Sequence, residues 1–314
     1  MNKVQLIEEI RRLKQEKNAV ILAHYYTIGD IQDIADFVGD SLALAQKAAN
    51  STADIIVMCG VHFMGETCKI LCPTKKVLVP DLAAGCSLAD SCPAEDFGAF
   101  VKAHPGYTVL SYVNTTAAVK YYTDIVVTSG NALKIVNSLP KDEKIIFAPD
   151  RNLGSYINAV TGRQMLLWDG ACHVHEQFST EAILKLKQEH PGAKVLVHPE
   201  CKRPVVLLAD KVGSTAVLLK FAVEDDCREF IVATESGILH EMMRQAPQKT
   251  FIPVPPEVSE GKIGCSCNEC AYMRLNTLEK LYACLRDETP EIHVNEKIIT
   301  RAKLPIDRML ELSK

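Results

Sequence analysis

The run Ala19-Val-Ile-Leu-Ala-His24 decides the interpretation of the chain, because two similar runs follow it at nearly equal spacing. They are Thr108-Val-Leu-Ser-Tyr112 and Lys194-Val-Leu-Val-His198, and their last residues lie 88 and 86 positions apart. Short apolar runs that end in a polar residue are typical of buried parallel strands with a functional group at the carboxyl end. The equal spacing indicates an internal repeat.

The repeat continues beyond these strands. A hydroxyl residue that opens a predicted helix stands 17 positions after each strand end, at Ser41, Ser129 and Thr215. Second strands are predicted at 54–59, 144–148 and 229–233, and third strands at 77–80, 164–168 and 250–254. Each unit therefore has the pattern β-α-β-α-β, which places a small parallel sheet between helices.

These units predict an α/β protein with three pseudo-threefold-related α/β/α domains, each with a short parallel sheet, around a central active site. The expected boundaries are 1–90 with an N-terminal helix, 91–177, 178–260, and a C-terminal segment at 261–314. From its position, the tail at 292–314 is expected to pack on the first helix. A single large doubly wound sheet is the alternative, but it does not explain the equal spacing.

Composition excludes several classes of partner. The 314 residues carry a net charge of -4, so no basic excess binds nucleic acid or an anionic membrane. No apolar run approaches the roughly 20 residues of a membrane span. Residues 1–18 carry Val4, Ile7, Ile10 and Leu13 at helical spacing, which predicts an amphipathic helix and not a signal peptide. We therefore expect a cytoplasmic protein.

A cysteine follows the third predicted strand of each unit. Cys86 and Cys172 occupy this place in the first two units, and in the third it falls, after an insertion of roughly ten residues, in the cluster Cys265-Ser-Cys-Asn-Glu-Cys270. One cysteine from each unit would converge on the pseudo-axis. Three thiolates leave one metal position open, which predicts a 4Fe-4S cluster whose free iron acts on substrate as a Lewis acid.

Polar residues at the strand ends are expected to line the same cavity. His24, Tyr112 and His198 end the first strands, and Tyr26, Asn114 and Glu200 each follow two positions later. Ser41, Ser129 and Thr215, with Ser214, stand at predicted helix N-termini, where a hydroxyl commonly caps the helix. Because the repeat places all three termini at the cavity, we assign these hydroxyls to the binding of substrate anions. Met64, Glu66 and Glu235 follow the second strands and either wall the site or serve packing.

The chain resembles the quinolinate synthase family in segments that span nearly its whole length. Two departures are visible: Ala271 stands where the family often has Pro, and Asp169 stands where it often has Pro in Trp-Pro-Gly. Neither removes a ligand. The matching segments are Ala23-His-Tyr-Tyr26, Gly39-Asp-Ser41, Cys59-Gly-Val-His-Phe-Met64, Pro80-Asp-Leu-Ala-Ala-Gly-Cys-Ser-Leu-Ala-Asp90, Ser111-Tyr-Val-Asn-Thr115, Cys172-His-Val-His175, His198-Pro-Glu-Cys201, Val212-Gly-Ser-Thr215 and Cys267-Asn-Glu-Cys-Ala-Tyr-Met273.

The resemblance implies a reaction and a ligand set. Iminoaspartate would condense with dihydroxyacetone phosphate, losing phosphate and two waters, to give quinolinate for de novo NAD biosynthesis. L-aspartate oxidase would supply the first substrate. Cys86, Cys172 and Cys270 would hold the 4Fe-4S cluster, whereas spacing alone leaves Cys265 and Cys267 open as the third ligand.

The chemistry of such a condensation suggests roles for the cavity residues. Glu200 is the first choice for general base, and Tyr26, Tyr112, His24 and His198 are candidates for proton transfer or enediolate stabilisation. His175 is expected to touch the phosphate or the substrate, and Asn114 to bind substrate. Two other functions remain open: a different hydro-lyase with a three-cysteine cluster, and a non-enzymatic metal or redox sensor built on the terminal cysteines.

Overall fold

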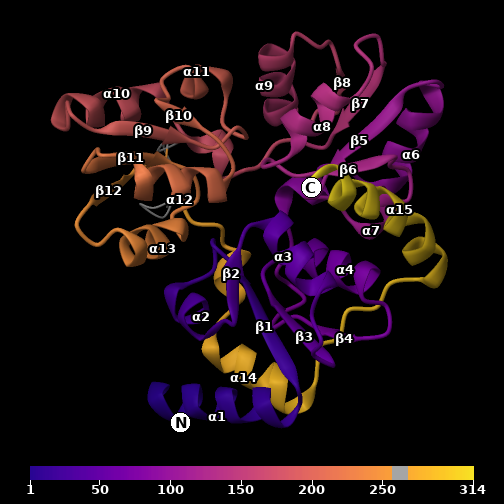
Figure 1. Cartoon of the computed structure of the whole chain (residues 1–314), viewed down its shortest axis with the longest axis vertical. Helices are drawn as coiled ribbons and strands as arrows, with labels where there is room; N and C mark the ends of the chain where they lie inside the picture. Colours follow the sequence, from indigo (N-terminus) through magenta and orange to yellow (C-terminus); the bar gives the residue numbers. More distant parts are fainter. Residues whose placement is uncertain (257–267) are drawn as a thin grey trace, which may run out of the picture.

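The computed structural model describes residues 1–256 and 268–314. It contains three four-stranded parallel sheets with the same strand order, β2-β1-β3-β4, β6-β5-β7-β8 and β10-β9-β11-β12. We call them, with their helices, the first, second and third units. Figure 1 shows the three units around a common centre. The predicted fold class, three α/β/α units with short parallel sheets, is confirmed.

The first unit alternates helices and strands from the N-terminus. Its elements are α1 (Lys3–Glu16), β1 (Ala19–His24), α2 (Gly29–Ile34), β2 (Phe37–Gly39), α3 (Ser41–Ala49), β3 (Ile55–Cys59), α4 (His62–Leu71), β4 (Lys76–Leu78) and α5 (Ser87–Asp90). The three central residues of β3 are fully buried or nearly so, which explains why the strand is apolar on both faces.

The second unit repeats this order element by element. Its elements are α6 (Ala94–Ala103), β5 (Thr108–Tyr112), α7 (Ala117–Lys120), β6 (Ile125–Val127), α8 (Ala132–Ser138), β7 (Ile145–Ala148), α9 (Arg151–Thr161), β8 (Leu166–Leu167) and the 3-10 turn η1 (His175–Gln177).

The third unit repeats it once more, and the C-terminal segment follows. The third unit consists of α10 (Thr180–Glu189), β9 (Lys194–Val197), α11 (Arg203–Val206), β10 (Lys211–Val212), α12 (Thr215–Glu224), β11 (Glu229–Ala233), α13 (Ile238–Gln245) and β12 (Thr250–Pro253). The C-terminal segment consists of η2 (Met273–Leu275), α14 (Leu278–Asp287) and α15 (Glu296–Leu312).

Each unit has one more strand than the sequence pattern predicts. The additional strands β2, β6 and β10 are two or three residues long and stand directly before the hydroxyl residues. Segments of this length carry too few alternating or apolar residues to form a recognisable pattern, and they pair only because β1, β5 and β9 offer a free edge.

An aspartate before each short strand anchors the sheet in all three units. The side chains of Asp36, Asp124 and Asp210 accept hydrogen bonds from backbone N–H groups of β1, β5 and β9, at 2.8, 2.9 and 2.7 Å. Their own N–H groups donate to the carbonyl of the same strand residue, at 2.9 Å in each case. The paired bonds fix the register of the short strand beside the first one.

The C-terminal segment is divided between two units. Helix α14 packs on α1, where Leu281 and Leu285 meet Ile10 in a fully buried cluster that also includes residues of the first sheet. Helix α15 instead packs on β6 and α7 of the second unit and on α4 (Figure 1). The prediction that the tail packs on the first helix is therefore wrong.

Helix α1 forms as predicted, but a different stripe faces the core. Leu6, Ile10 and Leu13 are buried, whereas Val4 is 65% exposed. The helix begins with a capping box between Asn2 and Gln5. Among the described residues, no helix combines the length and the apolar character needed to cross a membrane.

Candidate active site

A cavity lies where the carboxyl ends of the strands of all three units meet. It encloses about 730 Å³, open space at its mouth included. Every predicted site residue lines it except Ser214. The lining residues that had been predicted are His24, Tyr26, Ser41, Cys86, Tyr112, Asn114, Ser129, Cys172, His175, His198, Glu200, Thr215 and Cys270. The structure thus gathers residues that lie up to 246 positions apart in the sequence.

The loops that carry Cys86, Cys172 and Cys270, here called the ligand arms, are attached in the same way. In each unit, the residue two positions before the cysteine accepts a backbone hydrogen bond from the third residue after the second long strand. The three bonds are His62 N–H to Ala84 O at 2.7 Å, Arg151 N–H to Gly170 O at 2.8 Å and Ser236 N–H to Asn268 O at 3.1 Å. Cys270 therefore occupies the same place in the repeat as Cys86 and Cys172. Cys265 and Cys267 lie outside the described residues.

Each of the three thiols also precedes a short helical turn. Backbone N–H groups two or three residues further along the chain donate toward the sulfur in all three arms, as the Leu88 and Ala89 N–H groups do for Cys86. Burial raises the pKa of Cys86 to about 12, and it raises the pKa of Cys172 and of Cys270 as well. Because the thiols lie near one another, Cys270 further raises the pKa of Cys86, and Cys86 further raises the pKa of Cys172.

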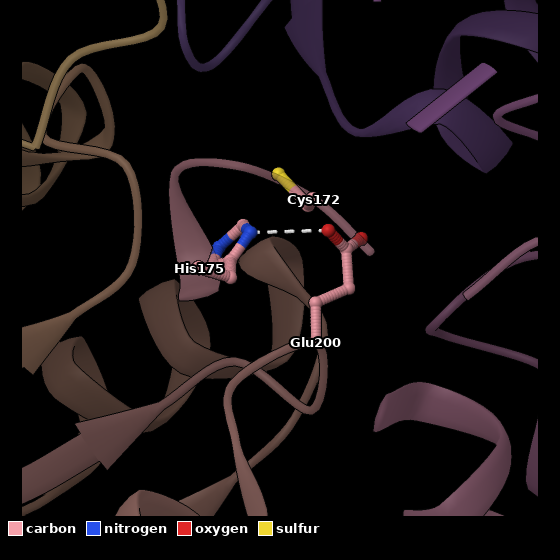
Figure 2. Close-up of side chains that lie close together, drawn as sticks. All are labelled: Cys172, His175 and Glu200. Carbon is pink, nitrogen blue, oxygen red and sulfur yellow. Dashed lines mark ion pairs between the residues drawn. The ribbon is translucent and has the colours of Figure 1, made fainter. Parts of the chain in front are cut away.

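Glu200 is the central carboxylate of the cavity and is 3% exposed. The Tyr112 hydroxyl donates to its Oε1 at 2.5 Å, and His175 Nδ1 lies 3.0 Å from its Oε2. Figure 2 shows the His175 ring facing the Glu200 carboxylate. Burial favours the neutral acid, but the imidazoles of His175 and His198 and the Tyr112 hydroxyl together hold the pKa of Glu200 below its ordinary value. Glu200 is therefore an ionised base held between a phenol and an imidazole.

Further hydrogen bonds join the units to one another around Glu200. His175 Nε2 lies 3.0 Å from the Thr234 hydroxyl, which in turn lies 2.8 Å from the Tyr26 hydroxyl. Tyr26 also meets the Thr215 hydroxyl at 2.8 Å. The network thus runs from the first unit through the third to the second. Sequence reasoning missed Thr234, although it directly follows the end of β11.

The two strand-end histidines are buried and neutral. Burial lowers the pKa of His24 to about 4 and that of His198 to about 3, against the opposing effect of the Glu200 carboxylate. The His198 ring stacks on His175 with 4.7 Å between ring centroids. At neutral pH these imidazoles offer one donor and one acceptor each and carry no charge.

The predicted helix N-termini are only partly available to anions. Asp40 caps α3, and its carboxylate already accepts the Ala43 N–H at 3.0 Å. Ser214 caps α12. Ser129 does not open a helix, because Asn131 accepts the Thr128 N–H and closes a turn before α8 begins at Ala132. The prediction of a helix start at Ser129 is wrong, although the residue still lines the cavity.

A fully buried lysine supports the loop that carries Asn114. The Lys120 ammonium donates to the carbonyls of Val113 and Thr115, on either side of Asn114. Burial lowers the pKa of Lys120 to about 8. Asn114 Oδ1 has no hydrogen-bond partner among the described residues, so the loop presents a free acceptor to the cavity. No sequence pattern marked Lys120, because it is a single charged residue at the end of a short helix and lysine is seldom fully buried.

Three residues that follow the second long strands differ between units. Val61, Asp150 and Glu235 each lie two positions after the strand end. Asp150 is fully buried and caps α9, and burial together with Glu200 raises its pKa well above the ordinary value. Burial raises the pKa of Glu235 to about 7. Met64 and Glu235 line the cavity as sequence analysis allowed, whereas Glu66 accepts the Ala117 N–H at 2.9 Å.

Comparison with known proteins agrees with this geometry. Residues 8–311 match the model of the Quinolinate synthetase A protein family. The chain is 56% identical over 310 residues to the quinolinate synthase of Thermosynechococcus vestitus, covering 99% of this chain and 96% of the relative. It is 57% identical over 304 residues to that of a Synechococcus strain (97% and 94%), and 54% identical over 314 residues to that of Chloroherpeton thalassium (100% and 96%).

The chain belongs to the quinolinate synthase family. The resemblance seen in the sequence is confirmed, and with it the prediction that the chain is an enzyme of this family.

The donor set of this family member fits an iron–sulfur cluster. Thiolates are the usual ligands of such clusters, and one thiol comes from each ligand arm. The N–H groups that point at each sulfur would stabilise it as an anion. Because burial keeps the free thiols protonated, cluster binding would release protons. Cys172, His175 and Glu200 also form a group whose ligand atoms lie within 4.8 Å of one another, and which could hold a single metal ion.

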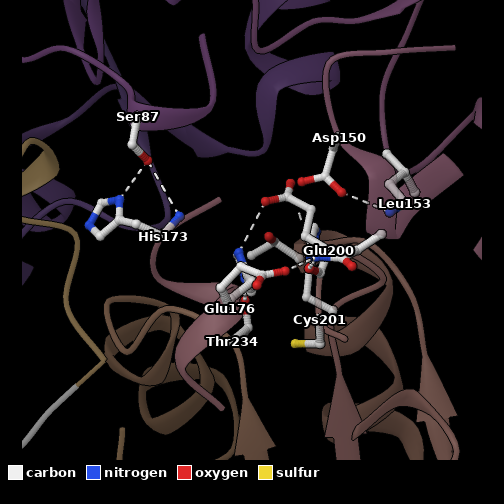
Figure 3. Close-up of polar contacts among 12 residues, drawn as sticks. Ser87, Asp150, Leu153, His173, Glu176, Glu200, Cys201 and Thr234 are labelled. Atoms are coloured by element: carbon white, nitrogen blue, oxygen red, sulfur yellow. Dashed lines mark hydrogen bonds and ion pairs between the residues drawn. The ribbon is translucent and has the colours of Figure 1, made fainter. Parts of the chain in front are cut away.

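A second ring of contacts joins the ligand arms to one another. The Ser87 hydroxyl, next to Cys86, lies 2.6 Å from His173 Nδ1, next to Cys172 (Figure 3). The His173 ring makes an edge contact with Tyr272, two residues after Cys270. Sequence reasoning missed these residues, although each lies one or two positions after a predicted ligand.

Proposed function

We propose that the chain is a quinolinate synthase that condenses iminoaspartate with dihydroxyacetone phosphate to give quinolinate, phosphate and two waters. The product serves de novo NAD biosynthesis. Family membership supports the overall activity. The observation that carries the detailed proposal is the convergence of three equivalent ligand arms beside a buried, ionised Glu200 in one cavity.

Cys86, Cys172 and Cys270 would hold a 4Fe-4S cluster, which when bound supplies an open iron that polarises substrate oxygens as a Lewis acid. Their equivalent places in the repeat favour this set over one that includes Cys265 or Cys267. A cluster held by one arm from each unit also makes cluster binding depend on the correct placement of all three units.

The proton chemistry is assigned to the residues around Glu200. Its carboxylate is ionised and lies in the cavity, so we assign to it the removal of a proton from carbon next to a carbonyl. The Tyr112 hydroxyl and His175 hold the two carboxylate oxygens in place. Tyr26, with neutral His24 and His198, donates hydrogen bonds to an enediolate oxygen as negative charge develops there.

Substrate anions would be held mainly by neutral donors. The described residues that line the cavity include no lysine or arginine. Hydroxyls of Ser41, Ser129 and Thr215, with Ser214 behind them, and the side chains of Asn114 and His175 are assigned to the two carboxylates and the phosphate. The Asp40 carboxylate close to Ser41 disfavours a doubly charged group there, so we assign the phosphate to the side of Ser129.

We propose further that L-aspartate oxidase supplies the unstable iminoaspartate in the cytoplasm. We also propose that the units are domains bounded at 1–90, 91–177 and 178–260, with a C-terminal segment at 261–314. The short connections between successive units support these boundaries, since α6 begins four residues after α5 ends.

The proposal is tested by purifying the protein without oxygen, measuring iron and sulfide, and adding aspartate oxidase, aspartate and dihydroxyacetone phosphate. We expect about four irons per chain and quinolinate as the product. Cys86→Ala, Cys172→Ala and Cys270→Ala should each lose the cluster, while Cys227→Ala, at a half-buried surface position, should keep it.

Three outcomes would overturn parts of the proposal. An iron-free protein with one tightly held zinc that requires His175 would favour the Cys172, His175 and Glu200 group as a single-metal site. Full cluster content in Cys86→Ala and Cys172→Ala would favour a metal or redox sensor built on the terminal cysteines. A complete cluster with dehydration of a hydroxy acid but no quinolinate would favour a different hydro-lyase.

A further inference from the structure

More residues separate the cysteine of the third ligand arm from its sheet than in the other two arms. Cys86 follows the end of β4 by 8 residues and Cys172 follows the end of β8 by 5, whereas Cys270 follows the end of β12 by 17. The entropic cost of loop closure rises with the number of residues in the connection. Contacts close to Cys270 therefore matter most for the third arm.

Glu235 supplies one such contact. Its side chain is 1% exposed and lies in the loop after β11. Oε1 accepts the backbone N–H of Cys270 at 3.0 Å, and Oε2 accepts the N–H of Gly237 at 2.7 Å. The carboxylate thus joins the cysteine of the third arm to the sheet that lies beneath it.

Arg274 adds a second contact from the other side of Cys270. Its guanidinium lies 3.2 Å from Glu235 Oε1 and 3.3 Å from the Ser236 hydroxyl. The same nitrogen lies 3.4 Å from the carboxylate of Glu269, the residue directly before Cys270. Arg274 therefore connects residues before and after the cysteine to the same loop.

The equivalent positions in the other units hold the cysteine less completely. The first unit has Val61 there, which has no acceptor in its side chain. In the second unit Asp150 accepts the Leu153 N–H at 2.8 Å and also interacts with the Cys172 N–H, while its other oxygen points toward Glu200 (Figure 3).

The second arm has an ionic contact of its own, because Arg151 pairs there with Asp169 and Glu176, at 3.2 Å each. Among the described residues, however, no arginine binds the carboxyl group that faces its cysteine.

We propose that Glu235 and Arg274 form a clasp that positions Cys270, so that the third ligand arm meets the other two. The inference deepens the proposed function and rests on Cys270 being a cluster ligand. Glu235 and Arg274 act through the arm and are positioning residues. Loss of the clasp raises the mobility of Cys270 but leaves Cys86 and Cys172 in place.

The test measures alkylation of the full-length, cluster-free protein by iodoacetamide, resolved at each cysteine by mass spectrometry. Arg274→Met is the decisive variant. The Arg274 charge lowers the pKa of Cys270, against the larger raising effect of burial, so its removal alone would slow alkylation. Release of the arm would instead speed it, and we expect about a tenfold faster reaction at Cys270.

Glu235→Leu should give the same increase at Cys270, and Cys86 and Cys172 should stay within about twofold of wild type in both variants. The matched control is Asp210→Leu, which removes a carboxylate that accepts a backbone N–H at the other end of the third sheet. It should leave the Cys270 rate unchanged. Equal increases at all three cysteines would report unfolding and contradict the clasp.

Cluster retention gives an independent measurement. After anaerobic reconstitution, both clasp variants should lose iron to a chelator about tenfold faster than wild type and Asp210→Leu. A contrary result would be Cys270 alkylation and iron retention as in wild type, but low activity, in Glu235→Leu. That result would overturn the clasp and indicate that Glu235 acts on substrate. Faster Cys270 alkylation in a protein that never takes up iron would keep the clasp and overturn the proposed cluster.

Discussion

Equivalent side chains of the three units are more alike at one end of the sheets than at the other. At the end remote from the cavity, Asp36, Asp124 and Asp210 stand in equivalent places and make the same pair of hydrogen bonds. At the cavity end, the strand-end residues are a histidine, a tyrosine and a histidine, and the positions after the second long strands are a valine, an aspartate and a glutamate.

The difference separates two kinds of constraint. Backbone geometry is repeated at both ends, since the ligand arms are attached by equivalent hydrogen bonds in all three units. At the remote end the aspartates are repeated, whereas at the cavity end the cysteines and the hydroxyl residues are repeated but the strand-end residues and those after the second long strands are not. The substrates proposed for the cavity have no threefold symmetry, so three equivalent positions face three different chemical groups there.

The largest effect is expected from Glu200→Gln at the cavity end. The amide still accepts from Tyr112 but is a very weak base, so kcat should fall about 10²- to 10⁴-fold. Thermal stability should be unchanged or higher, because a buried charge is removed. Steady-state kinetics and thermal unfolding check this. Glu241→Gln, at a buried carboxylate on α13, is the control. A higher KM at unchanged kcat would contradict the assigned role.

The next effect concerns the neutral histidines at the cavity end. Their pKa values in the fold, about 4 for His24 and about 3 for His198, lie below the 6.5 of an unperturbed imidazole. Their contribution to stability is therefore complete above pH 6.5 and is lost as pH falls toward these values. At pH 5 the low pKa of each histidine should lower the free energy of unfolding by about 2 kcal/mol relative to neutral pH.

Urea unfolding of the cluster-free protein between pH 7 and pH 4.5 measures this loss. His24→Gln and His198→Gln should each flatten the dependence of unfolding free energy on pH. Profiles parallel to that of wild type would show that these imidazoles are already protonated in the fold.

The anchor aspartates at the remote end should give smaller and nearly equal effects. Asp36→Ala, Asp124→Ala and Asp210→Ala each remove one acceptor of a backbone N–H, which should lower the free energy of unfolding by about 1–2 kcal/mol. Asp→Asn at the same positions keeps an acceptor and should lower the free energy of unfolding by less. Strongly unequal losses in urea unfolding would mean that the three anchors are not equivalent.

The smallest effect is expected from an ion-pair group between the first unit and the C-terminal segment. Glu288 pairs with Lys17 and Lys76, and hydrogen bonds from these two lysines lower its pKa to about 2. The three side chains are partly exposed, so Glu288→Gln should cost less than about 1 kcal/mol at low salt and less still at high salt. A loss as large as that of an anchor aspartate would contradict this ranking.

The threefold repeat, the parallel sheets and the residues at the carboxyl ends of the strands could be predicted from the sequence. These features depend on local apolar patterns and on a regular spacing of 88 and 86 residues. The regular spacing also predicted that Cys86 and Cys172 occupy equivalent places in the repeat. The anchor aspartates could also have been predicted from the sequence, because each follows its strand-end residue by 12 positions.

The tertiary structure decided which of these residues touch. The placement of Glu200 between Tyr112 and His175, the bridge through Thr234 and the contact of Glu235 with Cys270 join segments that are distant in sequence. No local pattern contains such contacts, because they depend on how three separately folded sheets are set around one cavity. The short strands β2, β6 and β10 form for the same reason, since only a neighbouring strand edge makes them favourable.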